Sequence, residues 1–327
     1  MNPVVSIVIV NYNAGPYLRR CLDSLEKQSL RDFELIVVDN ASKDQSLADA
    51  ECRPWIKVVK NEVNLGFAPA QNQGMRLARG SYLMPLNFDI HLMPEFLSSA
   101  VSAFEQYPQV GTVSGKMLQM RPDGEWTDIV DNAGLLLPKR RFPIHRGNGE
   151  PDQGQYQQPA LVFGAMGAAA VYRREMLEDI AYRDQYFDES FFTWYEDIDL
   201  DWRGRLRGWD CLYLPQAVAY HVGDPQMNLR TPFAARHGIR NRWQMILANE
   251  CPHCMLHNFH WFCVEEISLL RHVVTHGQLQ AYMKGSFEFI SRLPSVIKKR
   301  RWVRRRATRS CLPEYPLTVT YQSEIGE

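Results

Sequence analysis

The N-terminal third of the chain alternates between short apolar runs and segments with helical periodicity. The apolar runs predict strands buried on both faces, at residues 4–10, 33–38, 56–59, 82–86 and 110–113. Between them, apolar residues recur at helical spacing in residues 17–28, 68–79 and 93–106. Strands that alternate with helices predict an α/β fold, with an open, largely parallel sheet and helices on both faces.

Polar residues follow three of the predicted strands at the point where each strand ends. They are Asn11 and Asn13, then Asp39, and then Asn87 and Asp89. Because ligands of open α/β sheets bind beyond the carboxyl ends of the strands, we expect these side chains to converge on one binding rim. No GxGxxG follows the first strand and no GxxxxGK[ST] loop occurs, which disfavours a dinucleotide-dependent dehydrogenase and a P-loop NTPase.

The second half of the chain has a less regular pattern. Residues 121–159 are rich in Gly, Pro, Asp and Gln, and are expected to be irregular or to form small hairpins. Residues 161–172 predict one strand with close backbone approach at Gly164 and Gly167. Further strands are expected at 209–214 and 218–221, and helices dominate beyond about residue 230.

The densest cluster of carboxylates lies in the segment FFTWYEDIDLDWRGRLRGW, residues 191–209. A helix is expected from Glu196, with Gly208 just past its end. Its apolar residues recur at the spacing of one helix face: Ile198, Trp202 and Leu206. Asp197 and Asp201 share another face. A solvated acidic face paired with arginines would give the same pattern. Because aromatic residues precede this helix and burial raises carboxylate basicity, we predict Asp197 as a general base.

Asn87 and Asp89 also suit a hard divalent cation. Mg²⁺ or Mn²⁺ prefers carboxylate and carbonyl oxygens and takes waters and phosphate oxygens as further ligands. His221, at the end of a later strand, is a second candidate ligand, and a purely structural role explains a lone histidine equally well.

Charge is balanced overall but unevenly distributed. The 327 residues carry 37 basic and 37 acidic side chains, yet residues 298–309, KKRRWVRRRATR, hold eight basic side chains and no acid. A solvated run, an anionic-membrane contact and a nucleic-acid patch stay open for this segment. We favour the membrane, because each basic group near an anionic surface contributes about 1 kcal/mol, and we expect no nucleic acid.

The seven cysteines are odd in number and mostly isolated, which is typical of a reducing compartment. The N-terminus has no signal-peptide pattern, and no apolar run approaches the roughly 18 residues that span a bilayer. We therefore expect a cytoplasmic protein, peripheral on the inner face of the plasma membrane. One cluster superficially suggests zinc, but its three-residue spacing also suits one helix face, which we favour: Cys251, Cys254, His257, His260 and Cys263.

Six segments in order resemble the family 2 inverting glycosyltransferases of GT-A fold, in particular their bacterial rhamnosyltransferase-like branch. They are SIVIVNYN at 6–13, VVDNAS at 37–42, NLGFAPAQNQG at 64–74, LNFD at 86–89, FGAMGAAAVYRRE at 163–175 and FFTWYEDIDLDWR at 191–203. The resemblance covers roughly residues 4–245. It implies a dTDP-, UDP- or GDP-sugar donor, a divalent metal (Mg²⁺ or Mn²⁺) and a single displacement with inversion at the anomeric carbon.

The resemblance also implies roles for the residues that match these motifs. The nucleotide-binding residues would be Val10, Asn11, Asn13, Asp39, Asn40, Gly66, Asn72 and Asn87. Asp89 and His221 would be metal ligands, since relatives have a metal-contacting histidine about two dozen residues after the base and His221 lies 24 residues after Asp197. Asp197 would deprotonate the acceptor hydroxyl, with Glu196 as the second candidate. The sequence departs from the branch at Phe88, where Pro is usual.

Together these inferences divide the chain at residue 245. A GT-A glycosyltransferase domain is expected over 1–245, with a nucleotide-sugar half at about 1–115 and an acceptor or catalytic half at about 116–245. A helical, basic extension follows at 246–327. The expected function is transfer of a hexosyl or rhamnosyl group to a glycan or lipid-linked acceptor, in bacterial cell-surface polysaccharide synthesis. The alternative is a non-catalytic scaffold at the membrane that binds nucleotide sugars or glycans, which Asn87 in the reduced metal motif favours.

Overall fold

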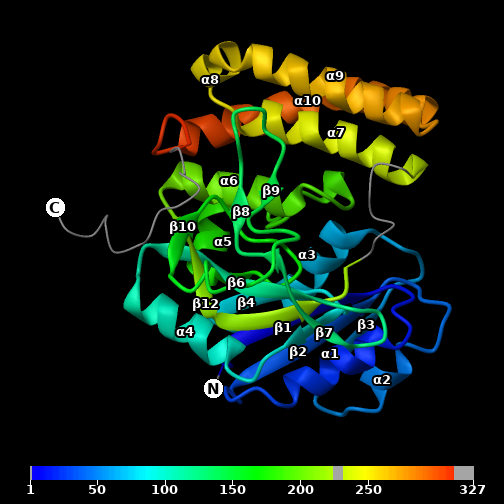
Figure 1. Cartoon of the computed structure of the whole chain (residues 1–327), viewed down its shortest axis with the longest axis vertical. Coiled ribbons are helices and arrows are strands. Elements are labelled where there is room, and N and C mark those ends of the chain that lie inside the picture. Colours follow the sequence, from blue (N-terminus) through cyan, green and yellow to red (C-terminus); the bar gives the residue numbers. More distant parts are fainter. Residues whose placement is uncertain (1, 224–230, 313–327) are drawn as a thin grey trace.

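The computed structural model describes residues 2–223 and 231–312. Figure 1 shows a central sheet with helices on both faces and a stack of helices above it. The strands are β1 (Val5–Asn11), β2 (Phe33–Asp39), β3 (Ile56–Lys60), β4 (Tyr82–Leu86), β5 (Ile90–Leu92), β6 (Val110–Met120), β7 (Trp126–Asn132), β8 (Leu135–Leu136), β9 (Ile144–His145), β10 (Ala160–Val162), β11 (Val171–Arg173) and β12 (Asp210–His221).

The helices divide into those that flank the sheet and those that follow it. They are α1 (Tyr17–Leu25), α2 (Ala48–Glu51), α3 (Phe67–Leu77), α4 (Phe96–Gln106), α5 (Arg174–Ile180), the 3₁₀ turn η1 (Glu189–Phe191), α6 (Glu196–Arg207), α7 (Pro232–Asn249), α8 (Pro252–His257), α9 (Phe259–Thr275) and α10 (Leu279–Arg306). The strands and helices predicted in the first 115 residues are confirmed to within a few residues, except that β6 is longer.

The main sheet has the order β10-β12-β6-β11-β4-β1-β2-β3, with β5 also paired to β12 and β7 to β6. Pairing is parallel between β1 and both β2 and β4, between β2 and β3, and between β12 and β6. β11 is antiparallel to both of its neighbours. The predicted mixed, largely parallel sheet is therefore confirmed.

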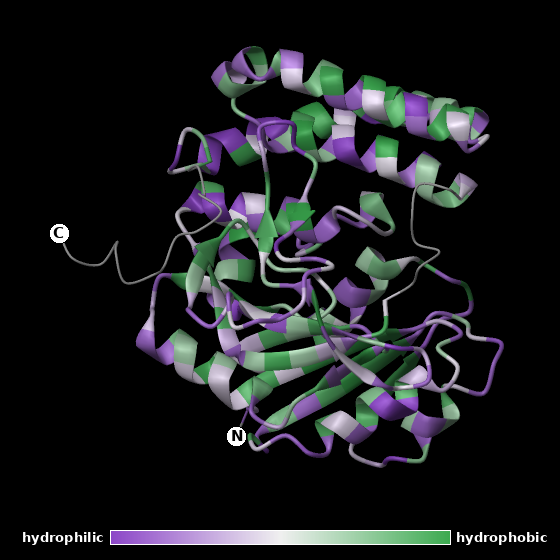
Figure 2. Cartoon of the chain, in the orientation of Figure 1, coloured by the Kyte–Doolittle hydropathy of each residue, from purple (hydrophilic) through white to green (hydrophobic). Residues whose placement is uncertain are grey.

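The central strand β1 is buried on both faces, as its unbroken apolar run predicts. Val5, Ile7 and Ile9 belong to the core beneath α1 and α4. Val8 and Val10 belong to the core on the opposite face, which includes residues of α3 and α5. Figure 2 shows the apolar strands enclosed between these helical layers. Parallel strands packed in this way present their carboxyl ends, and the polar residues there, along one edge.

One prediction for the middle of the chain is wrong, and one alternative of another is confirmed. Residues 161–172 do not form one strand: β10 and β11 are separated by a turn-rich segment at 163–170. The reason is that the backbone N–H groups of Ala165 and Gly167 donate to carboxylates of α6, which interrupts strand pairing after the bridge between Gly164 and Leu135 of β8. Residues 121–159 contain short antiparallel pairings, in agreement with the small hairpins that were one of the two alternatives: β7 pairs with β6 and β8 pairs with β9.

The helices that follow β12 form a third core with α6. Its buried residues include Trp202 and Leu206 of α6, Met245 of α7, Phe262 of α9 and Val303 of α10. The helical C-terminal region expected from the sequence is therefore present, although α7 runs through residue 245 without a break. None of the described helices is long and apolar enough to cross a membrane.

The basic run at 298–309 is not uniformly solvated, so the explanation of this segment as a solvated run does not hold for all of its residues. Lys299 is 2% exposed, and its Nζ donates to Asp188 at 2.6 Å and to both carboxylate oxygens of Asp199 at 2.8 Å. Asp199 also accepts from Arg203, four residues later on α6. A lysine of the tail is thus the cationic partner of two carboxylates, one just before η1 and one on the acidic helix.

We expect this ion-pair cluster to give the protein an acid-sensitive stability. Burial by itself raises the pKa of Asp188, but Lys299 and the hydrogen bonds from Ser190 lower it to about 2. The pKa of an aspartate in the unfolded chain is about 3.9. The contribution of ionised Asp188 to the free energy of unfolding is therefore complete above about pH 4 and is lost as the pH falls toward 2. Urea unfolding at several pH values should show a shallower acid decline in Asp188→Asn. An identical decline in both proteins would contradict this assignment.

Candidate active site

The polar residues at the ends of β1 and β2 meet in one hydrogen-bonded network. The Nδ2 of Asn11 donates to Asp39 Oδ1 at 2.8 Å, to Ser42 Oγ at 3.0 Å and to Ser46 Oγ at 3.1 Å. The second carboxylate oxygen of Asp39 accepts from the backbone N–H of Ser42 at 3.2 Å. Asn13 lies beside them, and its Oδ1 accepts from the N–H of Lys43 at 2.8 Å. Adjacent parallel strands bring these residues together, as expected.

Asn40 extends the network to the start of α3. Its Nδ2 donates to the carbonyl oxygen of Gly66 at 3.0 Å. Gly66 has φ +92°, and a Cβ there would lie 2.5 Å from the ring of Phe192, so no other residue fits. Asn72 is buried, and its amide is bonded to protein backbone and not directed at a nucleotide site. Its amide donates to and accepts from the backbone of Phe187, at 2.7 and 3.0 Å, which ties α3 to the segment before α6.

The two predicted metal ligands lie side by side because β5 pairs with β12. In this antiparallel register His221 lies opposite Ile90, the residue after Asp89. The Nε2 of His221 is 3.4 Å from Asp89 Oδ2, and the Val222 N–H donates to the Asp89 carbonyl at 3.1 Å. Phe88, the departure from the family pattern, packs against the core beneath the sheet and so anchors the turn that presents Asp89.

Asp89 and His221 form a cluster with a third residue, Asp131, and these three residues are called the Asp89 cluster. Asp131 was not identified from the sequence. Its Oδ2 lies 2.9 Å from His221 Nδ1, so it fixes the ring with Nε2 directed at Asp89. Burial opposes a charge on the ring, but hydrogen bonds to Asp131 and Asp89 outweigh it and raise the pKa of His221 to about 10. Asp131 lies at the end of β7, within the stretch expected to be irregular, and nothing in its spacing marks it.

The acidic helix α6 places its carboxylates as the helical spacing predicts. The Oδ2 of Asp197 accepts from the N–H of Gly167 at 2.9 Å, and its Oδ1 accepts from the N–H of Ile198 at 2.8 Å. One turn later, Asp201 Oδ2 accepts from the N–H of Ala165 at 2.8 Å. The two aspartates thus share the face that meets the segment at 163–170. The close approach predicted at Gly167 is confirmed, since a Cβ there would lie 3.1 Å from that of Asp197.

Glu196 and Asp197 differ in their suitability as a base at neutral pH. Glu196 is 6% exposed, and its buried Oε2 has no hydrogen-bond partner among the residues that the structure describes. Burial and the nearby charge of Asp197 raise the pKa of Glu196 well above its usual range, which disfavours its carboxylate form. Burial also raises the pKa of Asp197, but the N–H groups of Gly167 and Ile198 oppose that shift. Asp197 is therefore the carboxylate that is both partly accessible and able to accept a proton.

His145 of β9 links the acidic helix to the Asp89 cluster. It is largely buried, and its ring interacts electrostatically with Asp197, Asp131 and His221. Burial lowers the pKa of His145, against the opposing effect of the two aspartates. No sequence pattern marks His145, because its position depends on the pairing of β8 with β9. A backbone bond at 2.8 Å, from the Asn87 N–H to the carbonyl of Ala168 next to Gly167, makes a second link.

The turn before α6 has an unusual backbone that α7 holds in place. Phe192, Trp194 and Tyr195 all have φ between 68° and 69°, a region costly for such bulky residues. The Nδ2 of buried Asn241 reaches the carbonyl oxygens of Phe191, Thr193 and Trp194, at 3.0, 2.7 and 2.9 Å. Asn241 therefore fixes the entry to the helix that carries Glu196 and Asp197.

We expect Asn241→Ala to lower kcat about 10- to 100-fold with little change in nucleotide binding, because a relaxed turn displaces Asp197. Glycosyl transfer and thermal stability would be measured side by side. Arg236→Ala, on the same helix but bonded to Glu288, is the matched control and should retain activity. Wild-type kcat in a folded Asn241→Ala protein would show that the turn needs no such support.

Comparison with known proteins identifies the family of this chain. The sequence profile of Glycosyl transferase family 2 matches residues 6–181, more than half of the chain. The chain belongs to this family. An N-acetylglucosaminyl-diphospho-decaprenol L-rhamnosyltransferase of Mycobacterium tuberculosis is 26% identical over 244 residues, which cover 68% of this chain and 76% of that protein. An uncharacterized glycosyltransferase of Haemophilus influenzae is 31% identical over 110 residues, which span only 37% of its length.

Solved structures of glycosyltransferases share the fold of this family 2 chain. The mannosyltransferase PcManGT from Pyrobaculum calidifontis, in complex with GDP-Man and Mn²⁺, aligns with a TM-score of 0.54 at 19% identity, covering 93% of this chain and 85% of that one. GalNAc-T7 with UDP, GalNAc and Mn²⁺ aligns with a TM-score of 0.64 at 15% identity, covering 90% and 58%. The predicted GT-A fold is thereby confirmed.

Proposed function

We propose that this chain is an inverting glycosyltransferase that moves a sugar from a nucleoside-diphosphate donor to a glycan or lipid-linked acceptor in bacterial cell-surface polysaccharide synthesis. The observation that carries the proposal is the position of Asp197. Its carboxylate accepts from the N–H of Ile198 in the first turn of α6 and from the N–H of Gly167, whose neighbour Ala168 accepts from the N–H of Asn87. The similarity to a rhamnosyltransferase and to sugar-nucleotide complexes supports it.

The donor nucleotide would bind at the ends of β1 and β2. Asp39 and Asn11 supply a fixed carboxylate and amide there, beside Val10, Asn13 and Asn40. Gly66 leaves room where a side chain would collide with Phe192. Asn87 would face the diphosphate, and Asn72 would act indirectly by holding the backbone of Phe187.

A divalent metal fits the Asp89 cluster. Asp89 Oδ2 and His221 Nε2 are close enough to bind the same ion, and Asp131 would orient the imidazole ring by accepting from its Nδ1, as carboxylates often do beside metal-binding histidines. An oxygen and an imidazole nitrogen suit Mn²⁺ or Mg²⁺ with waters and diphosphate oxygens completing the shell. Such an ion would neutralise charge on the departing diphosphate.

The chain's own residues would activate the acceptor. Asp197 takes the proton of the acceptor hydroxyl while the hydroxyl oxygen bonds to the anomeric carbon. The bond from that carbon to the nucleoside diphosphate breaks on the opposite face, so the configuration inverts. Glu196, whose carboxylate form burial disfavours, stays out of this proton transfer. The single-step reaction leaves the new sugar on the acceptor and releases a nucleoside diphosphate.

Nucleotide binding can be tested by thermal shift with UDP, GDP and dTDP, with and without Mn²⁺. A ligand that binds only the folded protein raises the midpoint of unfolding. We expect one nucleotide to raise the midpoint of unfolding only when the metal is present. This rise should be absent in Asp89→Ala and kept in His91→Ala, a change on β5 two residues after Asp89. A rise of equal size in Asp89→Ala would remove Asp89 from the metal site. Binding without any donor turnover would instead favour the non-catalytic scaffold.

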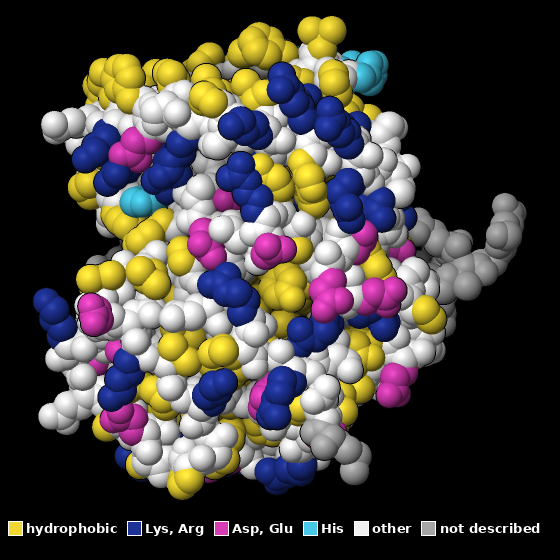
Figure 3. Space-filling model, turned by 180° about the vertical axis from the view of Figure 1, so that it is seen from behind, with side chains coloured by type: hydrophobic (Ala, Val, Ile, Leu, Met, Phe, Trp, Pro, Cys, Tyr) yellow, Lys and Arg dark blue, Asp and Glu magenta, His cyan; other side chains and the backbone are white. Residues whose placement is uncertain are grey.

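We also propose that the helical end of the chain rests on an anionic membrane. The described residues place a row of exposed apolar side chains on α8, α9 and α10, namely Leu256, Phe259, Trp261, Val264, Ile267, Leu270, Val274, Leu279, Met283, Phe287, Ile290 and Ile297. Figure 3 shows hydrophobic side chains gathered at the top of the molecule, with Lys and Arg side chains below them. Lys298, Arg301 and Arg305 of the basic run are exposed at helical spacing on α10.

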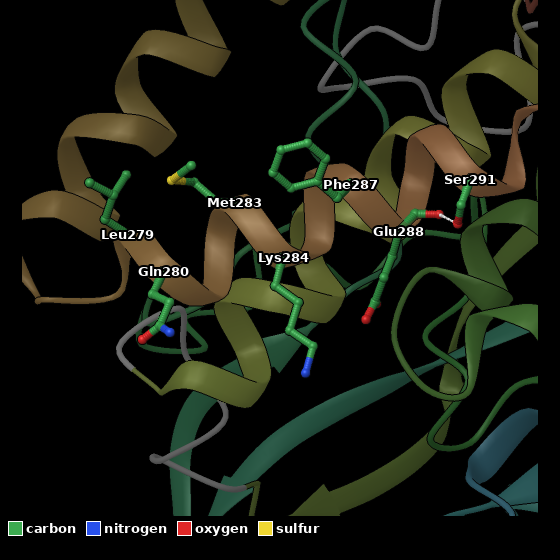
Figure 4. Close-up of a pocket in the computed structure, with 7 residues that line it drawn as sticks. All are labelled: Leu279, Gln280, Met283, Lys284, Phe287, Glu288 and Ser291. Carbon is green, nitrogen blue, oxygen red and sulfur yellow. Dashed lines mark hydrogen bonds between the residues drawn. The ribbon is translucent and has the colours of Figure 1, made fainter.

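A shallow groove of about 660 Å³ on α10 belongs to this surface. Figure 4 shows Leu279, Met283 and Phe287 projecting together from one side of the helix, while Gln280 and Lys284 project from the other. None of the residues that line the groove belongs to the candidate active site. Apolar side chains beside basic ones suit the interface of a bilayer with acidic headgroups.

Sedimentation with lipid vesicles tests the membrane contact. We expect binding to phosphatidylglycerol vesicles, and binding on the order of a hundredfold weaker when Lys298, Arg301 and Arg305 are all changed to Glu, since each basic group contributes about 1 kcal/mol. The matched control changes Arg19, Lys27 and Lys57, exposed on the opposite half of the molecule, in the same way. Equal loss in both triple variants, or binding independent of acidic lipid, would exclude this surface.

A further inference from the structure

A second cluster of ligand-type side chains lies outside the candidate active site, where α8 begins. The sulfur atoms of Cys251, Cys254 and Cys311 all lie within 4.8 Å of one another. The Sγ atoms of Cys251 and Cys311 are 2.7 Å apart, and Cys251 Sγ also accepts from the N–H of Cys254 at 3.0 Å. The α9–α10 reversal brings Cys311 back across 57 residues of sequence to a Cys-x₂-Cys pair.

The arrangement differs from the sequence-based candidate in this region. His260 and Cys263 lie on α9, and Cys263 is exposed and outside the trio. The spacing of the sequence does not mark Cys311 as a ligand, because it lies far along the chain from Cys254 and after the basic run. The structure therefore replaces a row of ligands along one helix with ligands from two separate segments, as ordinary protein metal sites have.

We propose that Cys251, Cys254 and Cys311 bind one zinc ion as thiolates, with water in the fourth position. In a tetrahedral site with Zn–S bonds of about 2.3 Å, sulfur atoms lie about 3.8 Å apart, within the spread of this trio. Thiolates select Zn²⁺ over the hard cation of the Asp89 cluster. Cys251 is buried while Cys254 and Cys311 are half-buried, so the site is enclosed on one side and open to water on the other.

Two arginines of the basic run lie close to this trio of cysteines. Arg300 of α10 interacts electrostatically with Cys251, and its Nη1 donates to the carbonyl of Leu247 at 2.6 Å, near the end of α7. Arg304 donates to the carbonyl of Ser310, the neighbour of Cys311, at 2.6 Å. Two arginines of the basic run therefore lie where three thiolates around one Zn²⁺ leave a net negative charge.

The zinc would fasten the end of α10 to the catalytic helix. Just before Cys311, the Thr308 N–H donates to the carbonyl of Leu206 at 2.9 Å, and Arg309 donates to that of Gly208 at 3.2 Å. These carbonyls are at the C-terminal end of α6. A metal that joins Cys311 to α8 holds this segment against α6, and its binding free energy adds to the stability of the folded chain.

The test uses the full chain purified under a phosphine reductant, without a metal-affinity step. We expect about one zinc per chain by inductively coupled plasma mass spectrometry. Exchange with Co²⁺ should give the near-ultraviolet sulfur-to-cobalt band of a thiolate site. Both signals should be lost in Cys254→Ser and Cys311→Ser and kept in Cys263→Ser, the matched control. Chelation should lower the thermal midpoint of the wild type and of Cys263→Ser.

A thiol titration of the wild type keeps the proposal testable even if the serine variants unfold. Of the seven cysteines, three should become unreactive when zinc is added and reactive again with chelator. No zinc after equilibration with Zn²⁺, or no change in the number of reactive thiols, would overturn the proposal. A Cys251–Cys311 disulfide that persists under the reductant, found in a cross-linked peptide, would also overturn it. None of these measurements depends on glycosyl transfer.

Discussion

Asp197→Asn is expected to lower the rate of sugar transfer by about 10²- to 10⁴-fold, the usual contribution of a positioned general base. The amide keeps the size, but its single oxygen can accept from only one of the two N–H groups, that of Gly167 or that of Ile198, so the thermal midpoint and donor binding are measured to show that the fold is preserved. The loss arises because no other group at this position takes the acceptor proton. Steady-state release of nucleoside diphosphate in the presence of acceptor measures it.

Glu196→Gln is the matched control for this change. A glutamine resembles the protonated form that burial favours for Glu196, so we expect less than a tenfold loss of kcat. The opposite order, with Glu196→Gln inactive and Asp197→Asn active, would assign the base to Glu196. Both variants inactive with native-like thermal midpoints would indicate that the pair acts as one unit.

Lys299→Met is expected to produce the largest loss of stability of any single change in the basic run. The substitution leaves Asp188 and Asp199 buried without their cationic partner, and breaking a buried pair in this way costs about 3–5 kcal/mol. Asp199 retains Arg203 and the amide of Asn249, so the lower end of this range is the better estimate. Urea unfolding followed by tryptophan fluorescence measures the change.

Lys298→Met is the matched control, because Lys298 has the same side chain in the adjacent position but is exposed. It should change the free energy of unfolding by no more than about 0.5 kcal/mol. Adding Asp188→Asn to Lys299→Met should recover part of the loss, since it removes one of the unpaired charges. If Lys299→Met and Lys298→Met unfold at the same urea concentration, Lys299 is not buried in solution.

The sequence is most informative where local pattern decides the structure. Apolar runs fix β1, β2 and β4, and helical spacing places Asp197 and Asp201 on one face of α6. The end of that helix is also local, since Gly208 adopts the left-handed conformation that closes it. For these elements the side-chain period and the capping residue are sufficient.

The sequence is least informative where function depends on pairing between distant segments. Asp131 and His145 lie in a Gly- and Pro-rich stretch, and only the contacts of β7 and β9 bring them to His221 and Asp197. Lys299 is one of eight basic residues in a run, and helix packing alone distinguishes it from its exposed neighbours. Cys311 reaches Cys251 only after the chain reverses between α9 and α10.

The anomeric configuration of the first product tests the central claim most directly. The donor would be the one selected by thermal shift. Proton NMR would follow the anomeric signal of the sugar as it is transferred to the acceptor or, more slowly, to water. A single displacement predicts that the first product has the configuration opposite to that of the donor, and that Asp197→Asn forms it far more slowly. A first product with the donor's own configuration would contradict the account, because it requires two displacements or a different geometry of attack.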